Sequence, residues 1–196
     1  MKKQHFILGT IALSLSVLAS CSKNDNDKAA PVKPAIVSTT VVNLDADAAN
    51  KGTFTLYSLA DNKIIPNSDS ATTKWDIGFK ATTLIINGGS SGPGKATAQV
   101  VTGIYNNLTL APEDGYVTDA TAKKAITGWY SYNMTTHIIS PVTGAFIVLK
   151  TANGNYAKLE ISSYYKDAPA TPTETAVSRH YNFRYVYQPD GTRNFK

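Results

Sequence analysis

Hydrophobic and polar residues alternate in short runs along most of this chain, and turn-forming pairs such as Asn153-Gly154 separate the runs. Alternation with a period of two is typical of half-buried β-strands, because successive side chains point to opposite faces. Nothing long follows the 3.6-residue period of an amphipathic helix. The pattern therefore predicts an all-β fold with antiparallel strands. Strands are expected at residues 36–44, 54–59, 63–66, 74–79, 84–86, 96–102, 146–150, 156–162 and 179–187.

A β-hairpin is the clearest local prediction. Asn153-Gly154 lies between two apolar, β-branched runs, and Asn-Gly favours the positive φ angles of a two-residue type I′ turn. Such a turn would place Val148 opposite Leu159. The expected core face then holds Phe146, Val148, Leu159 and Ile161, and the expected water-facing side holds Lys158 and Glu160.

Two further strands carry aromatic residues on one face. Residues 179–187 are expected to place an aromatic ladder in the core or on a half-buried sheet face, because each large ring removes much apolar surface from water when it is buried. In residues 74–79 the alternation predicts one apolar face and leaves Asp76 and Gly78 on the other. The ladder consists of Tyr181, Phe183, Tyr185 and Tyr187, and the apolar face of residues 74–79 consists of Trp75, Ile77 and Phe79.

The N-terminus is organised like a secretory signal peptide. Two lysines precede the apolar run Phe6–Val17, which is too short to span a bilayer convincingly. The run leads into Leu18-Ala19-Ser20-Cys21, which resembles a bacterial lipobox, and Cys21 is the only cysteine. We therefore expect residues 1–20 to be removed and Cys21 to be lipidated, which anchors the protein to a membrane. The alternative is ordinary secretion with an incidental cysteine.

Residues 21–35 are predicted to form the lipidated cysteine and a flexible tether, and residues 36–196 one domain large enough to bury a core. Removal of residues 1–20 leaves 17 of the 19 basic residues against 14 acidic ones, a net charge of +3. This excess is scattered. It shows neither the basic run nor the aromatic-basic interleaving of a nucleic-acid binder, so nucleic acid is not an expected partner.

A glycine-rich run is the one segment that resembles an enzyme motif. Gly89, Gly94 and Lys95 have the spacing of a phosphate-binding loop. The next residue is Ala96 instead of a hydroxyl residue, and a strand-like pattern follows in place of the helix that holds a phosphate. We therefore expect a long loop between two strands. No histidine beyond the signal peptide has a nucleophile or carboxylate pattern nearby, so no enzyme activity is expected.

Taken together, these segments resemble the HmuY family, haem-binding lipoproteins of Bacteroidetes. The resemblance implies an all-β fold peculiar to that family and a role in taking haem from host haemoproteins and passing it to an outer-membrane receptor. The acidic patch behind Cys21 resembles the surface-export signal of such lipoproteins, which implies the outer membrane and the cell surface. The matching segments are the lipobox and tether, Phe54–Ile65, Trp75-Asp76-Ile77, Asn87–Lys95, Asp114-Gly115-Tyr116, Trp129 and Thr151–Tyr165.

The resemblance also implies positions for the two axial iron ligands, which are histidines in some family members and methionines in others. The second ligand lies a few residues after the tryptophan that opens a strand, here Trp129, and the matching position is Met134. The first lies before that tryptophan, in a segment that is short here, residues 117–128, and contains neither histidine nor methionine. The remaining candidates are His137 and His180 as ligands and Tyr130 and Tyr132 as pocket residues.

Chain geometry limits how these ligands combine. His137 lies three positions after Met134, and three residues span only about 10 Å when extended. The two side chains can therefore hardly bracket one porphyrin ring, so at most one of them is axial on a given haem. The other ligand would be His180, a tyrosinate, water or a residue of another subunit. A thioether favours ferrous iron, so Met134→Ala is predicted to weaken ferrous haem binding.

Two functions remain open at this stage. The first is haem binding by a surface haemophore, which Met134 at the matching position favours. The second is binding of a glycan, a peptide or a partner protein by a family member that lacks a complete haem site. The short segment 117–128 favours this second function.

Overall fold

The computed structural model describes residues 33–196, which form one compact unit built mostly from β-strands. The predicted signal peptide, the lipidation of Cys21 and most of the predicted tether lie outside the described residues. Within residues 33–196 no helix is both long enough and apolar enough to cross a membrane. The elements are β1 (Val37–Asp45), β2 (Thr55–Ser58), β3 (Lys63–Ile65), the 3-10 helix η1 (Asn67–Asp69), β4 (Ile77–Lys80), β5 (Thr83–Ile86), β6 (Thr97–Thr102), the 3-10 helix η2 (Tyr105–Asn107), β7 (Tyr130–Tyr132), β8 (Ile139–Pro141), β9 (Ala145–Lys150), β10 (Tyr156–Tyr165) and β11 (Ser178–Gln188).

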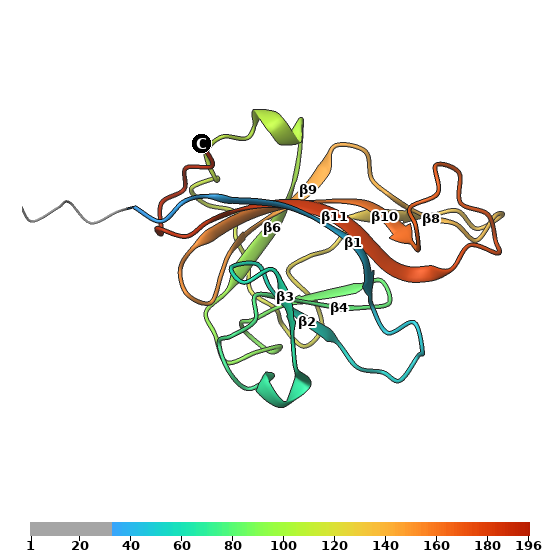
Figure 1. The fold of residues 1–196 in the computed structure, drawn as a ribbon, viewed down its shortest axis with the longest axis horizontal. Coiled ribbons are helices and arrows are strands. Elements are labelled where there is room, and N and C mark those ends of the chain that lie inside the picture. The colour runs from blue at the N-terminus through green and yellow to red at the C-terminus, as the bar shows by residue number, and fades with distance from the viewer. Residues whose placement is uncertain (1–32) are drawn as a thin grey trace, which may run out of the picture. The chain divides into compact units, whose positions relative to one another are not determined.

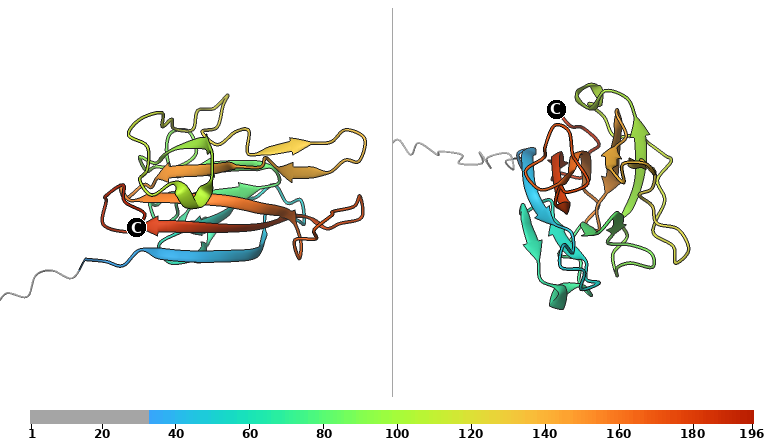
Figure 2. Two further views of the ribbon diagram at one scale, coloured as in Figure 1. Left: turned by 90° about the horizontal axis from the view of Figure 1, so that it is seen from above. Right: turned by 90° about the vertical axis from the view of Figure 1, so that its right-hand side faces the viewer.

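The strands form two larger sheets and a two-stranded one (Figures 1 and 2). The first sheet has the order β1-β11-β10-β9-β6, and the second has the order β3-β2-β4-β5. The two-stranded sheet is the hairpin of β7 and β8. Each pairing within these sheets is antiparallel, which confirms the predicted fold class.

Aromatic side chains join the two larger sheets. Phe79 of β4 stacks on Phe183 of β11 with ring centroids 5.4 Å apart, and Tyr57 of β2 meets Phe183 edge-on at 5.9 Å. Such pairs contribute about 0.5–1.5 kcal/mol beyond the area they bury. The predicted aromatic ladder of the last strand is confirmed as core, since Tyr181, Phe183, Tyr185 and Tyr187 are all buried.

Two hydroxyl groups of this ladder donate to backbone carbonyls at strand ends of the opposite sheet. The Tyr181 hydroxyl donates to the Ala81 carbonyl at 2.8 Å, and the Tyr185 hydroxyl donates to the Leu59 carbonyl at 2.9 Å. A buried hydroxyl without a partner would cost free energy, so these bonds allow tyrosine to occupy core positions. The bonds also fix the β4–β5 turn and the end of β2 against β11.

The β9–β10 hairpin closes with a three-residue loop instead of the predicted two-residue turn. The Thr151 N–H donates to the Asn155 carbonyl at 2.8 Å, and the Thr151 carbonyl accepts from the Gly154 N–H at 2.9 Å. Gly154 has φ 81°, the left-handed conformation that completes a three-residue hairpin loop. The additional loop residue shifts the strand pairing by one position, and such a shift changes which residues share a face.

The shift corrects the predicted faces of the hairpin. Val148 lies opposite Lys158, and Ile147 lies opposite Leu159, so the predicted pairing of Val148 with Leu159 is wrong. The main core between the sheets and a smaller cluster around Tyr105 take different residues of the hairpin. Ile147, Leu149, Leu159 and Ile161 belong to the main core, and Phe146 and Val148 belong to the smaller cluster.

Lys158 is a buried cation, and not the water-facing residue that the pattern predicts; it is 5% exposed. Its ammonium group donates to the carbonyls of Tyr105 and Leu108 at 2.8 Å each and lies 4.3 Å from the centre of the Tyr105 ring. Burial lowers the pKa of Lys158. Glu160, also expected to face water, is half-buried and forms an ion pair with Arg184 at 2.6 Å.

Trp75 differs from its predicted face. Ile77 and Phe79 belong to the main core as expected, but Trp75 packs in a separate cluster with Leu56 and Ile85. The prediction of one shared face is wrong for Trp75, because the regular alternation of β4 begins only at Ile77.

The glycine-rich run forms a loop between β5 and β6, and a strand follows it as predicted. The buried Asn87 side chain donates to the carbonyls of Thr72 and Trp75 and accepts from the Gly94 N–H at 3.0 Å. The loop passes so close to Asn87 that a Cβ at Gly92 or Gly94 would collide with it. The glycines therefore serve close packing around Asn87.

Candidate functional site

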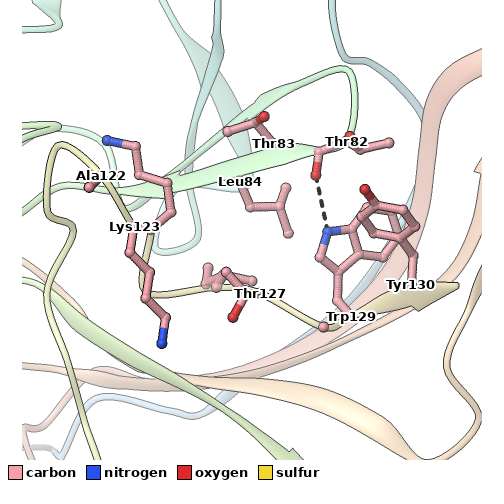
Figure 3. A pocket seen from close by; sticks show the side chains of 11 residues that line it. Thr82, Thr83, Leu84, Ala122, Lys123, Thr127, Trp129 and Tyr130 are labelled. Carbon is pink, nitrogen blue, oxygen red and sulfur yellow. Dashed lines mark hydrogen bonds between the residues drawn. The ribbon is translucent and has the colours of Figure 1, made fainter.

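The larger of two candidate ligand sites is a lateral pocket of about 500 Å³ between β5 and residues 122–130 (Figure 3). Small-molecule pockets commonly measure about 300–1,000 Å³. Polar and aromatic side chains dominate its walls. They include Thr82, Thr83, Lys123, Lys124, Thr127, Trp129 and Tyr130.

Two hydrogen-bonding residues hold the outer wall of the lateral pocket in place. Asp119 is 2% exposed, and its carboxylate accepts from the Ile86 N–H at 3.0 Å and from the Ala125 N–H at 2.8 Å. Further along, the Trp129 indole N–H donates to the Thr82 carbonyl at 3.2 Å, as the dashed line in Figure 3 marks. Residues 119–129 are therefore fixed against β5 and its turn at both ends.

The chemistry of the lateral pocket is cationic and hydroxyl-rich. The Lys124 ammonium donates to the hydroxyls of Ser90 and Ser91 at 3.1 Å each. In the described part of the chain, no carboxylate lies within 4 Å of Lys123 or Lys124. None of the residues that line the pocket is histidine, methionine or cysteine. Among the usual axial ligands of haem iron, the pocket therefore contains only a tyrosine, Tyr130.

A smaller hollow of about 230 Å³ lies where the β7–β8 loop meets the β10–β11 loop. Figures 1 and 2 show that these two loops extend together from the same end of the domain. The Ile139 N–H donates to the Tyr165 hydroxyl at 2.9 Å, which ties β8 to β10 beneath the hollow. We call this site the end hollow; its walls include His137, Ile138, Ile139, Tyr164, Tyr165, Glu174 and Arg179.

The β7–β8 loop presents His137 at the edge of the end hollow. The Asn133 side chain accepts from the N–H groups of Thr135 and Thr136 at 2.9 and 3.0 Å, and this local turn reverses the chain. His137 is exposed, with φ 52°, and its Nδ1 is hydrogen-bonded to the Tyr132 hydroxyl. A metal-binding histidine usually donates its other ring N–H to an acceptor; with Nδ1–H donating to the phenol oxygen, Nε2 is unprotonated and available to a metal.

The other two predicted ligands lie elsewhere. Met134 is 81% exposed in the β7–β8 loop. His180 lies on β11, where it pairs with Asp45 of β1, and its Nδ1 donates to the Ser178 carbonyl at 2.9 Å. Neither residue lines the lateral pocket or the end hollow. Within residues 33–196 no group of three or more histidine, cysteine, aspartate and glutamate side chains could hold a metal ion.

The structure separates the two predicted pocket tyrosines and adds residues that the sequence did not indicate. Tyr130 lines the lateral pocket, whereas Tyr132 supports His137. Tyr164 and Arg179 border the end hollow. The sequence indicated only that these two residues lie near strand ends. It could not indicate that they lie near His137, because that proximity depends on how two separate loops pack.

Comparison with known proteins identifies the fold. No family model matches the chain, and no curated protein matches its sequence. The apo form of an HmuY analog from Tannerella forsythia is 15% identical, with a TM-score of 0.56 over 81% of this chain and 99% of that chain. A Bacteroides vulgatus protein, provisionally described as HmuY-like and haem-binding, is 15% identical, with a TM-score of 0.51 over 80% of this chain and 96% of that one. A provisionally described lipoprotein of Bacteroides fragilis is 17% identical, with a TM-score of 0.51 over 77% of this chain and 89% of that one.

The chain therefore has an HmuY-like, all-β fold, and the resemblance noted from its sequence segments is confirmed at the level of the fold. Identities of 15–17% establish the fold alone.

Proposed function

We propose that this protein binds haem at the end hollow and that His137 is an axial iron ligand. One observation carries the proposal: an exposed imidazole, with Nδ1 held by Tyr132, borders a hollow whose other walls include Ile138 and Ile139. Haem needs such a combination of an iron ligand and apolar contact for its ring. The HmuY-like fold supports the proposal, because one solved protein of that fold is described as haem-binding.

The size of the end hollow favours an exposed haem. About 230 Å³ is less than the roughly 300–1,000 Å³ of pockets that enclose a small ligand. Haem would therefore lie against one wall with part of its surface open. An open site suits a carrier that takes haem from host haemoproteins and passes it to an outer-membrane receptor. We include this carrier role in the proposal, together with the lipid anchor at Cys21 and a location on the cell surface.

A haem titration tests the proposal. Residues 22–196, which include the whole compact unit, are titrated with ferric and with ferrous haem and followed by absorption spectroscopy. We expect saturable binding with the spectrum of an imidazole-ligated haem. His137→Ala should lower the affinity at least about tenfold, the effect of losing a contact worth roughly 1.4 kcal/mol.

His180→Ala is the matched control, because His180 also has Nδ1 in a hydrogen bond but lies outside the end hollow. It should bind haem like the wild type. A wild-type titration that gives only the spectrum of free haem would exclude the proposed function. An effect of His180→Ala in place of His137→Ala would move the iron site to β11.

The lateral pocket favours a second candidate function, the binding of an acidic glycan by a protein without a complete haem site. Its two lysines and three threonines suit carboxylate and hydroxyl groups, and its lining includes no histidine or methionine. If haem does not bind, acidic and neutral oligosaccharides can be compared on the wild type and on Lys123→Glu. Preference for the acidic sugar, lost in the variant, is the expected result; equal binding of both sugars would contradict it. Peptides and partner proteins are the other ligands of this second class.

A further inference from the structure

We infer that Arg179 recognises a haem propionate, so that the carboxylates of the porphyrin help to decide what the end hollow binds. The inference rests on the proposed haem function and adds the basis of ligand selection. Arg179 and His137 border the same hollow, although 42 positions separate them along the chain. A ligand with a metal at its centre and carboxylates at its edge matches that pair.

Neutral acceptors fix the guanidinium from one side. Arg179 is the second residue of β11 and has φ 61°. Its Nη1 donates to the Asp47 carbonyl at 3.0 Å and to the Asn50 side-chain oxygen at 2.9 Å. The Asp47 carboxylate is engaged within its own loop, where it accepts from the N–H groups of Lys51 and Gly52 at 2.7 and 2.8 Å. The guanidinium is thus positioned without an anionic partner.

The charge of Arg179 remains uncompensated within the described residues. None of their carboxylates lies within 4 Å of the guanidinium, and its hydrogen-bonding neighbours, the Asp47 carbonyl, the Asn50 side chain and the Tyr164 phenol, are all neutral. Nε and Nη2 form one edge of the guanidinium, the edge that binds a carboxylate through two parallel N–H···O bonds. A partly buried cation gains most from an anion that supplies both acceptors.

The surroundings of the guanidinium suit a carboxylate. Burial raises the pKa of the Tyr164 phenol to about 12, against the opposing effect of the nearby Arg179 charge, so this phenol is neutral at pH 7. It adds no negative charge to repel a propionate. Glu174 is the one carboxylate that lines the hollow; it is exposed and more than 4 Å from the guanidinium. A bound propionate would therefore displace no existing ion pair of Arg179.

Esterified haem separates recognition of the carboxylates from binding of the ring and iron. Wild-type protein is titrated with haem and with haem dimethyl ester, in which both propionates are uncharged. We expect a preference for haem of roughly 10- to 100-fold, the range of a charge-assisted hydrogen bond. Arg179→Gln should weaken haem binding by a similar factor and leave binding of the ester unchanged. Arg179→Lys keeps the charge and should retain part of the preference.

Arg184→Gln is the control, since Arg184 is paired with Glu160 and does not line the end hollow. It should leave both titrations unchanged. Equal losses for haem and ester in Arg179→Gln would reveal a packing role and overturn the inference. So would equal wild-type affinities for the two ligands, which would leave the haem function standing. If the wild type binds neither ligand, the proposed function and this inference fail together.

Discussion

The carboxylate of Asp119 accepts a hydrogen bond from the N–H of Ile86 at 3.0 Å, although 33 positions separate the two residues. Its other oxygen accepts from the Ala125 N–H at 2.8 Å. Asp119 is thus the buried link between β5 and the outer wall of the lateral pocket. Its position explains how a segment without regular secondary structure keeps a defined path.

Replacing Asp119 by alanine should destabilise the domain strongly. The change leaves two N–H groups without acceptors, and each unsatisfied buried group costs about 1–3 kcal/mol. We predict a loss of about 2–4 kcal/mol in the free energy of unfolding, measured by urea denaturation. Asp114→Ala, at an exposed position, is the control and should change stability by less than about 0.5 kcal/mol. Equal effects of the two variants would contradict the role given to Asp119.

Asp76 should make the domain less stable as the pH rises from about 4 to about 6. Asp76 is 4% exposed, and burial raises the pKa of its carboxyl from 3.8 to about 6. Below pH 4 both the folded and the unfolded chain hold the proton. Between the two values the unfolded chain releases it first, so the free energy of unfolding falls as the pH rises and stays low above pH 6. The fall is at most about 3 kcal/mol.

The variant that isolates this effect is Asp76→Asn, which cannot ionise. Its unfolding free energy, measured from pH 4 to pH 7, should lack the decline that Asp76 causes in the wild type. Asp114→Asn is the matched control at an exposed position and should keep the wild-type profile. A decline of the same size in Asp76→Asn would show that other groups cause the pH dependence of the unfolding free energy.

Gly154→Ala should weaken the β9–β10 hairpin without creating a clash. Gly154 has φ 81°, and no atom lies within 4 Å of where its Cβ would be. The cost is therefore conformational, about 1–2 kcal/mol for an L-residue held in the left-handed region. Thermal unfolding of Gly154→Ala and of the neighbouring Asn153→Ala measures it, and only the glycine variant should lose stability. No loss in Gly154→Ala would contradict the three-residue loop.

Met134→Ala distinguishes the iron ligand expected from the sequence from the one proposed at the end hollow. Met134 is 81% exposed, so its removal should leave the unfolding temperature nearly unchanged. Met134 does not line the end hollow, and at most one of Met134 and His137 can be axial on a given haem. With His137 as the ligand, Met134→Ala should therefore leave ferric and ferrous binding unchanged, whereas His137→Ala should weaken both, because imidazole serves both oxidation states. Titrations of ferric and ferrous haem decide this, and a loss of ferrous binding alone in Met134→Ala would move the iron site to Met134.

The sequence predicts strands best where period-two alternation coincides with large aromatic residues. The ladder of β11 is such a case, because Tyr181 and Phe183 lie on the same face of the strand and that face is buried in the main core. The hairpin register was less well determined. An Asn-Gly pair supplies a residue with positive φ to a two-residue turn and to a three-residue loop alike, so Asn153-Gly154 does not distinguish them.

Burial of Lys158 also depends on distant parts of the chain. The carbonyls that accept from its ammonium belong to Tyr105 and Leu108, 53 and 50 positions away. Alternation along β10 cannot contain that information, so a lysine at this position predicts a water-facing side.

Only part of the candidate site was accessible from the sequence. His137 was one of the ligand candidates named with the family resemblance, and the structure places His137 beside a hollow. Arg179 belongs to the same hollow only because the β10–β11 loop folds toward the β7–β8 loop. That packing is set by tertiary contacts such as the bond between the Ile139 N–H and the Tyr165 hydroxyl.

Because β1 and β11 are antiparallel, the start of β1 and the end hollow lie at opposite ends of β11. Val37, at the start of β1, pairs with Tyr187, whereas Arg179 lies eight positions earlier on β11, about 26 Å along the strand. The chain thus enters the domain at the end opposite the end hollow (Figure 1). On the predicted lipid anchor, the tether would therefore join the domain at the end away from the hollow. The predicted tether of residues 21–35 would reach at most about 50 Å, and this length would limit how far from the membrane the hollow can act.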